Sequence, residues 1–461
     1  MMWQARIRVV CLMIGDAVGL AAIFLTCAAV YRHFGGKYEL LEYLNLWPIL
    51  IVFWFVAGVI RLYHGHVFYP GAPLAPVEEL RRMFFAVTLT YLILFAFLAL
   101  TRRNTDYSRL VLLVSWFLSA GFLVPLRSLV RGLLKRFRLG QIPVLIAGYG
   151  HAGRQLAEEM AGSSYYGFAP AGYLDDEPVA GRLGCLNEAV PLARERGISV
   201  LLCCLPFTTI QRHLRDYMAY FTHVSIITNE KGFPISWAYP INVEGLPGIE
   251  LTNQLRQPMP RFLKFSFEVF LAGVGILFLW PLFLLLALLV RLSSPGPIFY
   301  RAKRLGLGGK DIEVFKFRTM YADADKRLEE MLAQNPELAA EWRSKFKLDN
   351  DARITPLGRF LRKTSLDELP QLFNVLRGEM AMVGPRPIVE AEKAYYGEHY
   401  EVFCRVKPGI TGLWQVSGRS DISYDRRVAL DLYYVFNWSI WLDLYILAMT
   451  FLEVTRCRGA K

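Results

Sequence analysis

Cysteine pairs of the CxxC type are missing from this 461-residue sequence. Its seven cysteines include no CxxC pair and no regular spacing, and its seven histidines are scattered. A structural zinc site needs closely spaced thiols or imidazoles, and a small secreted scaffold needs paired cysteines. The sequence therefore predicts neither kind of site, and its cysteine usage favours domains that lie in a reducing cytoplasm.

A separate basic arm is also missing, although the formal net charge is +12. The Lys and Arg residues lie beside apolar stretches instead, which argues against nucleic acid as a partner. A positive charge placed in this way favours anionic lipid headgroups or phosphorylated substrates.

Apolar residues are abundant, since 54% of the chain is hydrophobic and it holds 31 Phe, 23 Tyr and 10 Trp. Such a composition indicates membrane segments. The chain is also longer than the roughly 250–300 residues at which a single core stops growing, so several domains are expected. The predicted fold class is a mixed membrane protein.

Four apolar runs in the first third of the chain predict four transmembrane helices. Each run is close to the length that crosses the hydrocarbon core. The runs cover residues 9–30, 46–60, 84–100 and 110–126. No small-residue cleavage site follows the first run, so we expect a retained helix and not a signal peptide. Basic residues flank the runs so that both ends of the four-helix bundle, residues 1–138, are expected in the cytoplasm.

Residues 139–250 predict a Rossmann-like α/β domain. A buried strand leads into Gly148-Tyr149-Gly150-His151-Ala152-Gly153 and a helix, and Asp175 and Asp176 follow. In dinucleotide sites such glycines admit a pyrophosphate and the acid binds the ribose, so Gly148, Gly150 and Gly153 are candidate nucleotide-binding residues. No Tyr-x-x-x-Lys pair follows in this segment. We therefore favour a ligand-binding or purely structural domain over an NAD enzyme.

A fifth apolar run, residues 269–290, has Trp280-Pro281 at its centre and basic residues on both flanks. Pro281 removes a backbone donor and permits a sharp kink. Two cytoplasmic flanks and a central kink predict a re-entrant helix over about residues 262–291 that breaks at Pro281 and returns to the same face. The alternative is a straight span with a mild kink.

Residues 364–387, TSLDELPQLFNVLRGEMAMVGPRP, place the carboxylates of Asp367 and Glu368 side by side. Ser365 and Glu368 match a capping box, which is the simplest structural explanation. That helix would bring Pro370 to its fifth position, where the missing N–H leaves a carbonyl unpaired, so we expect the helix to begin nearer Asp367. The pair would then lie at a positive helix end that suits a phosphate.

Basic side chains surround the pair in the sequence. They are Arg359, Arg362, Lys363, Arg377 and Arg386. Arg386 stands between two prolines, which stiffen the backbone and can aim its guanidinium at a phosphate. These features predict a phosphate-handling site with a divalent metal, and the alternative is a solvated basic face.

From about residue 261 onward the sequence resembles the polyprenyl-phosphate hexose-1-phosphate transferases, the bacterial sugar transferases that include the large monotopic phosphoglycosyl transferases. Four ordered segments carry the resemblance: residues 297–301 (PIFYR), 316–320 (KFRTM), 364–387, and 407–419 (KPGITGLWQVSGR). The N-terminal spans and the Rossmann-like segment are similar to the long members of the family, nearest to those that transfer galactose phosphate. The resemblance thus extends over essentially the whole chain.

This resemblance implies a mainly helical monotopic catalytic domain, residues 251–461, on the cytoplasmic face of the bacterial inner membrane. Asp367 would attack the β-phosphorus of a UDP-hexose, release UMP and hold the sugar phosphate covalently. Undecaprenyl phosphate would then accept it, which is the first membrane step of exopolysaccharide, capsule or O-antigen synthesis. By position, Glu368 would hold Mg²⁺, with Mn²⁺ as the alternative, and Arg362 and Arg386 would bind phosphate.

Four further basic residues of the matched segments are expected near the substrate: Arg301, Lys316, Arg318 and Arg419. The family usually has Ser before the helix-breaking proline, whereas this chain has Trp280. Galactose is the expected sugar, with glucose next, and a homodimer in the lipid bilayer is the expected assembly. Two other functions stay open: a membrane-attached NAD-dependent nucleotide-sugar epimerase or dehydrogenase, and a non-enzymatic scaffold for polysaccharide assembly.

Overall fold

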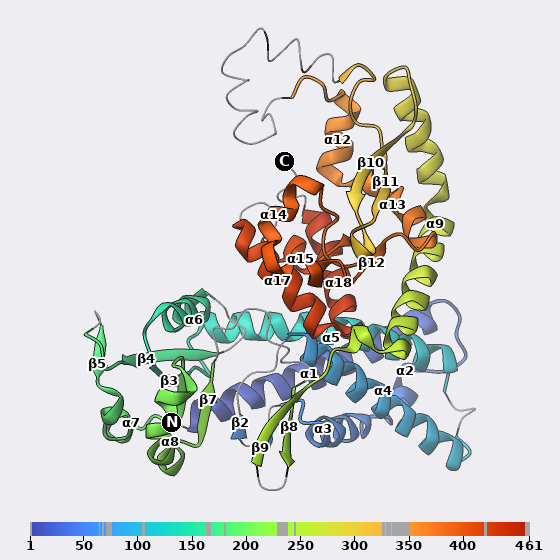
Figure 1. Cartoon of the computed structure of the whole chain (residues 1–461). Helices are drawn as coiled ribbons and strands as arrows, with labels where there is room; N and C mark the ends of the chain where they lie inside the picture. The colour runs from blue at the N-terminus through green and yellow to red at the C-terminus, as the bar shows by residue number, and fades with distance from the viewer. Residues whose placement is uncertain are drawn as a thin grey trace. The chain divides into compact units, whose positions relative to one another are not determined.

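The computed structural model forms two compact units, residues 1–229 and 230–461 (Figure 1). It describes residues 2–63, 65–66, 69–70, 76–103, 107–162, 167–178, 181–227, 238–243, 246–324, 328, 333, 351–418 and 422–456.

Apolar helices make up the first part of unit one. They are α1 (Met2–His33), α2 (Leu40–Leu44), α3 (Ile49–Val59), α4 (Pro76–Leu100) and α5 (Arg109–Arg136), with the two-residue strands β1 (Gly65–His66) and β2 (Tyr69–Pro70) between α3 and α4. They supply four of the five segments that are long and apolar enough to cross a membrane. The fifth is α9 (Pro258–Ser293) of unit two.

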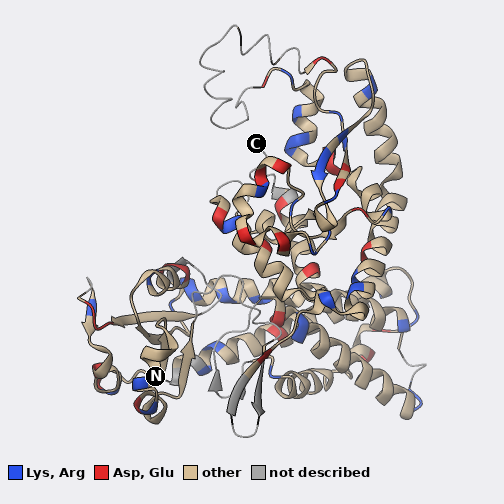
Figure 2. Ribbon diagram, in the orientation of Figure 1, with Lys and Arg blue, Asp and Glu red and all other residues tan. Residues whose placement is uncertain are grey.

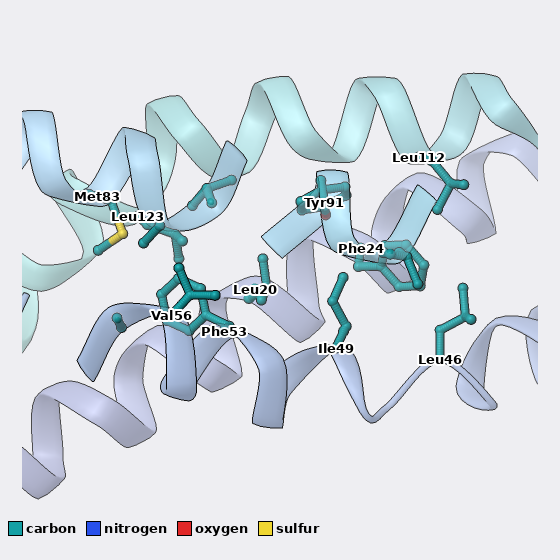
Figure 3. Packing of buried hydrophobic residues seen from close by; sticks show 14 of the residues in the cluster. Leu20, Phe24, Leu46, Ile49, Phe53, Val56, Met83, Tyr91, Leu112 and Leu123 are labelled. Carbon is teal, nitrogen blue, oxygen red and sulfur yellow. The ribbon is translucent and has the colours of Figure 1, made fainter. Parts of the chain in front are cut away.

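These helices pack around one apolar core. Leu20 and Phe24 of α1, Phe53 of α3, Met83 of α4 and Leu123 of α5 are all buried in it (Figure 3). Large apolar side chains also lie on the outside of the helices, as a bilayer requires.

A group of charged side chains is buried among α1, α4 and α5. The guanidinium of Arg127 donates to both carboxylate oxygens of Asp16, at 2.6–3.1 Å, and to Glu79 Oε1 at 2.8 Å. Arg131 also donates to Glu79, and the Tyr63 hydroxyl donates to Asp16 at 2.7 Å. The four charges balance within the group, which lowers the cost of their burial.

A parallel five-stranded sheet completes unit one, in the order β5-β4-β3-β6-β7. Its elements are β3 (Ile142–Ala147), α6 (His151–Gly162), β4 (Phe168–Leu174), β5 (Arg182–Gly184), α7 (Ala189–Arg196), β6 (Val200–Cys203), α8 (Phe207–Tyr220) and β7 (His223–Ile226). Chain order reverses beside β3, as in Rossmann-like folds. The predicted parallel α/β fold is therefore confirmed.

Unit two begins with a hairpin, β8 (Ala238–Val243) and β9 (Leu246–Leu251), followed by α9. A second hairpin, β10 (Phe299–Leu305) and β11 (Asp311–Phe317), comes next. The remaining elements are α12 (Pro356–Thr364), α13 (Gln371–Leu376), β12 (Ala381–Val383), α14 (Lys393–Tyr396), α15 (Tyr400–Phe403), β13 (Gly409–Thr411), α16 (Leu413–Val416), α17 (Tyr424–Asn437) and α18 (Ile440–Arg456).

Helix α9 runs without interruption through Pro281. On one side it packs into the core of unit two, where Phe283 lies 6.0 Å from the ring of Phe317 and 5.6 Å from that of Phe373. On its other side Leu277 and Phe278 are among many exposed apolar residues. The predicted break and re-entry at Pro281 stay a prediction.

Candidate functional site

The carboxylates of Asp367 and Glu368 lie in a short 3₁₀ turn, Leu366–Glu368, between α12 and α13. Ser365 is the left-handed residue that ends α12, and its side chain caps nothing. Pro370 is the N-cap of α13. The prediction of a helix that begins near Asp367 is thus wrong, because the chain turns once before that helix can start.

The helices on either side of this turn are both held close to β11 and to the residues that follow it. The buried amide of Asn374 accepts from Phe315 N at 2.9 Å and donates to Glu313 O at 2.7 Å, so it satisfies the free edge of β11. A Cβ at Gly358 would lie 2.0 Å from Thr319 O, so only glycine lets α12 approach this closely. Asn374 is a site-building residue that the sequence analysis missed, although it lies in the segment quoted there.

Asp367 is buried, with 8% of its surface exposed. Burial, followed by the neighbouring charge of Glu368, raises its pKa to about 6, against the opposing charges of Lys316 and Arg362. A poorly solvated carboxylate that is still ionised at neutral pH suits a nucleophile.

Glu368 is more accessible and pairs with a base from the hairpin. Lys316 Nζ donates to Glu368 Oε1 at 2.7 Å. Among the described residues no group of three or more His, Cys, Asp or Glu side chains could hold a metal. Mg²⁺ commonly takes only one or two protein carboxylates and completes its shell with substrate phosphates and water, so the Asp367–Glu368 pair fits this ion.

Arg362 lies close enough to Asp367 for their charges to interact. Its Nε donates to Thr319 Oγ1 at 3.0 Å, which fixes the start of the guanidinium. Its two terminal nitrogens make no hydrogen bond within the described part of the chain. They can therefore bind a phosphate beside the carboxylates.

Arg386 lies in a different basic group. Its exposed guanidinium is 5.7 Å from the ring of the buried Trp414, whose ring also faces Arg427 at 4.7 Å. Burial and the charge of Arg386 lower the pKa of Arg304, which places that residue nearby. Arg386 has no hydrogen-bond partner among the residues described, so its head is available to an anion.

The other predicted basic residues have separate positions. Arg301 pairs in register with Phe315, the neighbour of Lys316, so it projects from the opposite face of the hairpin and forms an exposed ion pair with Glu313 at 3.1 Å. Arg318 donates to Ser294 O at 2.6 Å and thereby holds the end of α9. Arg419 lies outside the described residues. Of the three that are described, the structure brings only Lys316 to the carboxylates. Figure 2 shows basic residues on α12 and on the β10–β11 hairpin.

The glycine-rich loop of unit one has a packing explanation. Gly148 has a φ of +93°, and a Cβ at Gly153 would lie 2.0 Å from Gly148 O. Asp175 Oδ2, the candidate ribose ligand, accepts from Tyr149 N at 2.7 Å. Of the three candidate glycines, only Gly150 has room for an added Cβ. The loop thus uses its acid to satisfy its own backbone.

Comparison with known protein families gives two matches. The model for bacterial sugar transferases matches residues 259–457, and a model described as a CoA-binding domain matches residues 74–226. The first match contains every residue of the carboxylate site, and the second covers α4, α5 and the whole parallel sheet.

Individual relatives are similar over most of the chain. Undecaprenyl-phosphate galactose phosphotransferase of Salmonella typhimurium is 34% identical over 397 residues, which cover 83% of this chain and 82% of that protein. UDP-glucose:undecaprenyl-phosphate glucose-1-phosphate transferase of Escherichia coli is 32% identical, over 75% of this chain and 76% of that protein. Exopolysaccharide production protein ExoY of Rhizobium meliloti is 48% identical over 211 residues, which cover 46% of this chain and 93% of that protein.

Proposed function

Since the chain belongs to the bacterial sugar transferases, we propose that it transfers a hexose-1-phosphate from a UDP-hexose to undecaprenyl phosphate and releases UMP. The observation that carries the proposal is the buried Asp367 next to Glu368, with Lys316 and Arg362 beside them. One of the relatives is named for UDP-glucose and undecaprenyl phosphate, another for undecaprenyl phosphate and galactose, and a third is an exopolysaccharide production protein. The product, a lipid diphosphate sugar, would begin the assembly of a surface polysaccharide.

The chemistry we propose is a double displacement at phosphorus. A carboxylate oxygen of Asp367 forms a bond to the β-phosphorus, and the bond from that phosphorus to the bridging oxygen breaks, so UMP leaves with the electron pair. A phosphate oxygen of undecaprenyl phosphate then attacks the same phosphorus and releases the carboxylate. Arg362 and Lys316 neutralise the charge of the diphosphate.

Glu368, with Asp367 beside it, would hold Mg²⁺ at the diphosphate. When bound, the ion supplies charge neutralisation for the departing phosphate. Lys316, which pairs with Glu368 in the structure, is then free to turn to a phosphate oxygen. In this proposal Arg386, which lies near Trp414 and Arg304, binds a phosphate of the substrate.

We propose galactose as the sugar, with glucose as the alternative. Relatives named for galactose transfer are 34% identical to the chain, and those named for glucose transfer are 30–32% identical. This difference is small, so the choice depends on a direct measurement.

We also propose that unit two is monotopic, on the cytoplasmic face of the inner membrane. Contacts from this one unit reach α9 at Lys264, which pairs with Asp443, and again at Phe283, beside Phe317. Nineteen helical residues separate these points, about 28 Å, which is close to the thickness of the hydrocarbon core. A simple span would not keep one aqueous domain against its full length. A homodimer is part of the proposal.

The test is UMP release by the purified protein with Mg²⁺. Each of several UDP-hexoses is supplied with and without undecaprenyl phosphate. We expect sustained UMP release from one UDP-hexose only when the lipid is present, and a single stoichiometric burst without it. Asp367→Asn should abolish both, and full turnover by this variant would exclude Asp367 as the nucleophile. No UMP from any UDP-hexose would overturn the proposed function.

A further inference from the structure

Two charged residues lie near the start of the mostly apolar helix α9, and their side chains contact other elements of unit two. They are Lys264 and Glu268, one helical turn apart, and the side chain of Glu268 is only 6% exposed. Charged residues are costly in a membrane-associated helix, so they need a compensating role.

The ammonium of Lys264 is surrounded by oxygens. Its Nζ lies 2.8 Å from Glu268 Oε1, 2.8 Å from Asp443 Oδ2, 2.9 Å from the Tyr434 hydroxyl and 3.0 Å from Val383 O. The Tyr434 hydroxyl lies 2.8 Å from Val383 O and 2.8 Å from Asp443 Oδ1, and its single proton is donated to one of these two oxygens. The group therefore joins α9, β12, α17 and α18.

Val383 is the residue on which these contacts meet. Its carbonyl accepts from Lys264 Nζ and lies within hydrogen-bond distance of the Tyr434 hydroxyl, and its N–H donates to Glu268 Oε1 at 3.2 Å. Both backbone polar groups of this one residue are thus held by side chains of the group. If Lys264 and Glu268 served only to attach α9 to the rest of unit two, they would not need to bind both the N–H and the carbonyl of Val383.

Val383 leads directly into the turn that carries Arg386. Gly384 N donates to Thr411 O at 2.9 Å, and Gly409 N donates to Pro385 O at 2.8 Å. A Cβ at Gly384 would lie 2.6 Å from Lys407 O. The turn is therefore tightly held, and it continues without a spacer from Val383, so a shift of Val383 would be passed on to it.

We propose that Lys264 and Glu268 are positioning residues that hold Val383, and through it the turn 384–387, so that Arg386 is aimed at the phosphate of the substrate. This inference rests on the proposed function for its phosphate ligand. It makes the seating of α9 a condition for an ordered phosphate contact, because the residues that hold the turn belong to the membrane-associated helix.

A double-mutant cycle separates positioning from simple anchoring. Lys264→Met should lower kcat/KM for the UDP-hexose about tenfold in the unaltered protein, and less than about twofold in an Arg386→Ala background, where the aimed contact is already lost. Equal losses in both backgrounds would overturn the proposal. Arg261→Met is the matched control, since Arg261 is an exposed base on the same helix. It should leave kcat/KM for the UDP-hexose unchanged in both backgrounds.

Two further measurements cover variants that fold poorly or lack activity. Glu268→Gln keeps the volume and an acceptor for Val383 N, so it should lose less activity than Glu268→Ala, and equal losses would count against positioning. Hydrogen exchange of the peptide that spans residues 381–388 needs no substrate. It should be faster in Lys264→Met than in Arg261→Met, and equal exchange would overturn the inference. Absence of UMP release by the unaltered protein would overturn only the proposed function.

Discussion

The two faces of the β10–β11 hairpin give its basic side chains different tasks. Lys316 faces the carboxylates, whereas Arg301 faces away and pairs with Glu313 on an exposed surface. An exposed pair contributes little free energy, while a charged hydrogen bond to a substrate phosphate is worth about 1.5–3 kcal/mol.

We expect losses of different size for two arginines that the sequence analysis places at or near the substrate. Arg362→Ala should lower kcat/KM for the UDP-hexose about 10- to 100-fold, because it removes a charged contact beside Asp367. Arg301→Ala should stay within about threefold of the unaltered protein. UMP release under identical conditions measures both, and a large loss in Arg301→Ala would contradict the hairpin register.

Asp431 of α17 makes stability depend on pH. Burial raises its pKa to about 7, although a hydrogen bond from Tyr396 and the charges of Arg386 and Arg427 oppose the shift. The folded state holds this proton more tightly than the unfolded chain does. Ionisation of Asp431 therefore costs folding free energy, and stability is lost as the pH rises from 3.8 through about 7.

Asp431→Asn removes this dependence. Its melting temperature relative to the unaltered protein should rise by a few degrees between about pH 5 and about pH 8. Thermal unfolding in detergent at several pH values measures the difference. Asp425→Asn, an exposed change on the same helix, is the control. A difference that is independent of pH would show that Asp431 does not titrate in this range.

At the scale of elements, the buried ion group fastens three membrane helices. Arg127 of α5 contacts Asp16 of α1 and Glu79 of α4. Removal of one partner leaves a buried charge uncompensated, so Arg127→Leu should destabilise the protein by about 3–5 kcal/mol. The double variant Arg127→Leu, Asp16→Leu should be more stable than the single one, because Arg131 still balances Glu79. Thermal stability in detergent measures both, and an additive loss would contradict charge balance as the cause.

The elements that depend on long apolar patterns were predictable from the sequence. The candidate membrane helices and the parallel strands follow from run length and from alternation with helices. The turn at Asp367 was not predictable, because it depends on hydrogen bonds between Asn374 and the backbone of β11, which is far away in the chain. The side of the hairpin on which Arg301 lies depends on strand register, which single-sequence patterns do not specify. The hydrogen bond from Tyr149 N to Asp175 could likewise not be read from the glycine-rich motif.

At the scale of the whole molecule, the transferase activity is expected to reside in unit two alone. The bacterial sugar transferase match spans residues 259–457, which lie entirely within that unit. The match to ExoY of Rhizobium meliloti covers 93% of that protein but only 46% of this chain. A protein that lacks most of the rest of this chain therefore exists. Unit two also has its own apolar core, which includes residues of α9.

Residues 230–461, which are the whole of unit two, should therefore release UMP from the same UDP-hexose as the full chain when they are expressed in membranes. A domain with its own core can fold alone, so we expect kcat/KM within about threefold of the full chain. The same truncation with Asp367→Asn is the control for contaminating activity. A truncated protein that is folded and membrane-bound but inactive would mean that unit one contributes to catalysis. Equal activity would assign the helices α1 to α5 and the parallel sheet to tasks other than the transfer itself, because the carboxylates, the arginines proposed to bind phosphate and the helix proposed to position Arg386 all belong to unit two.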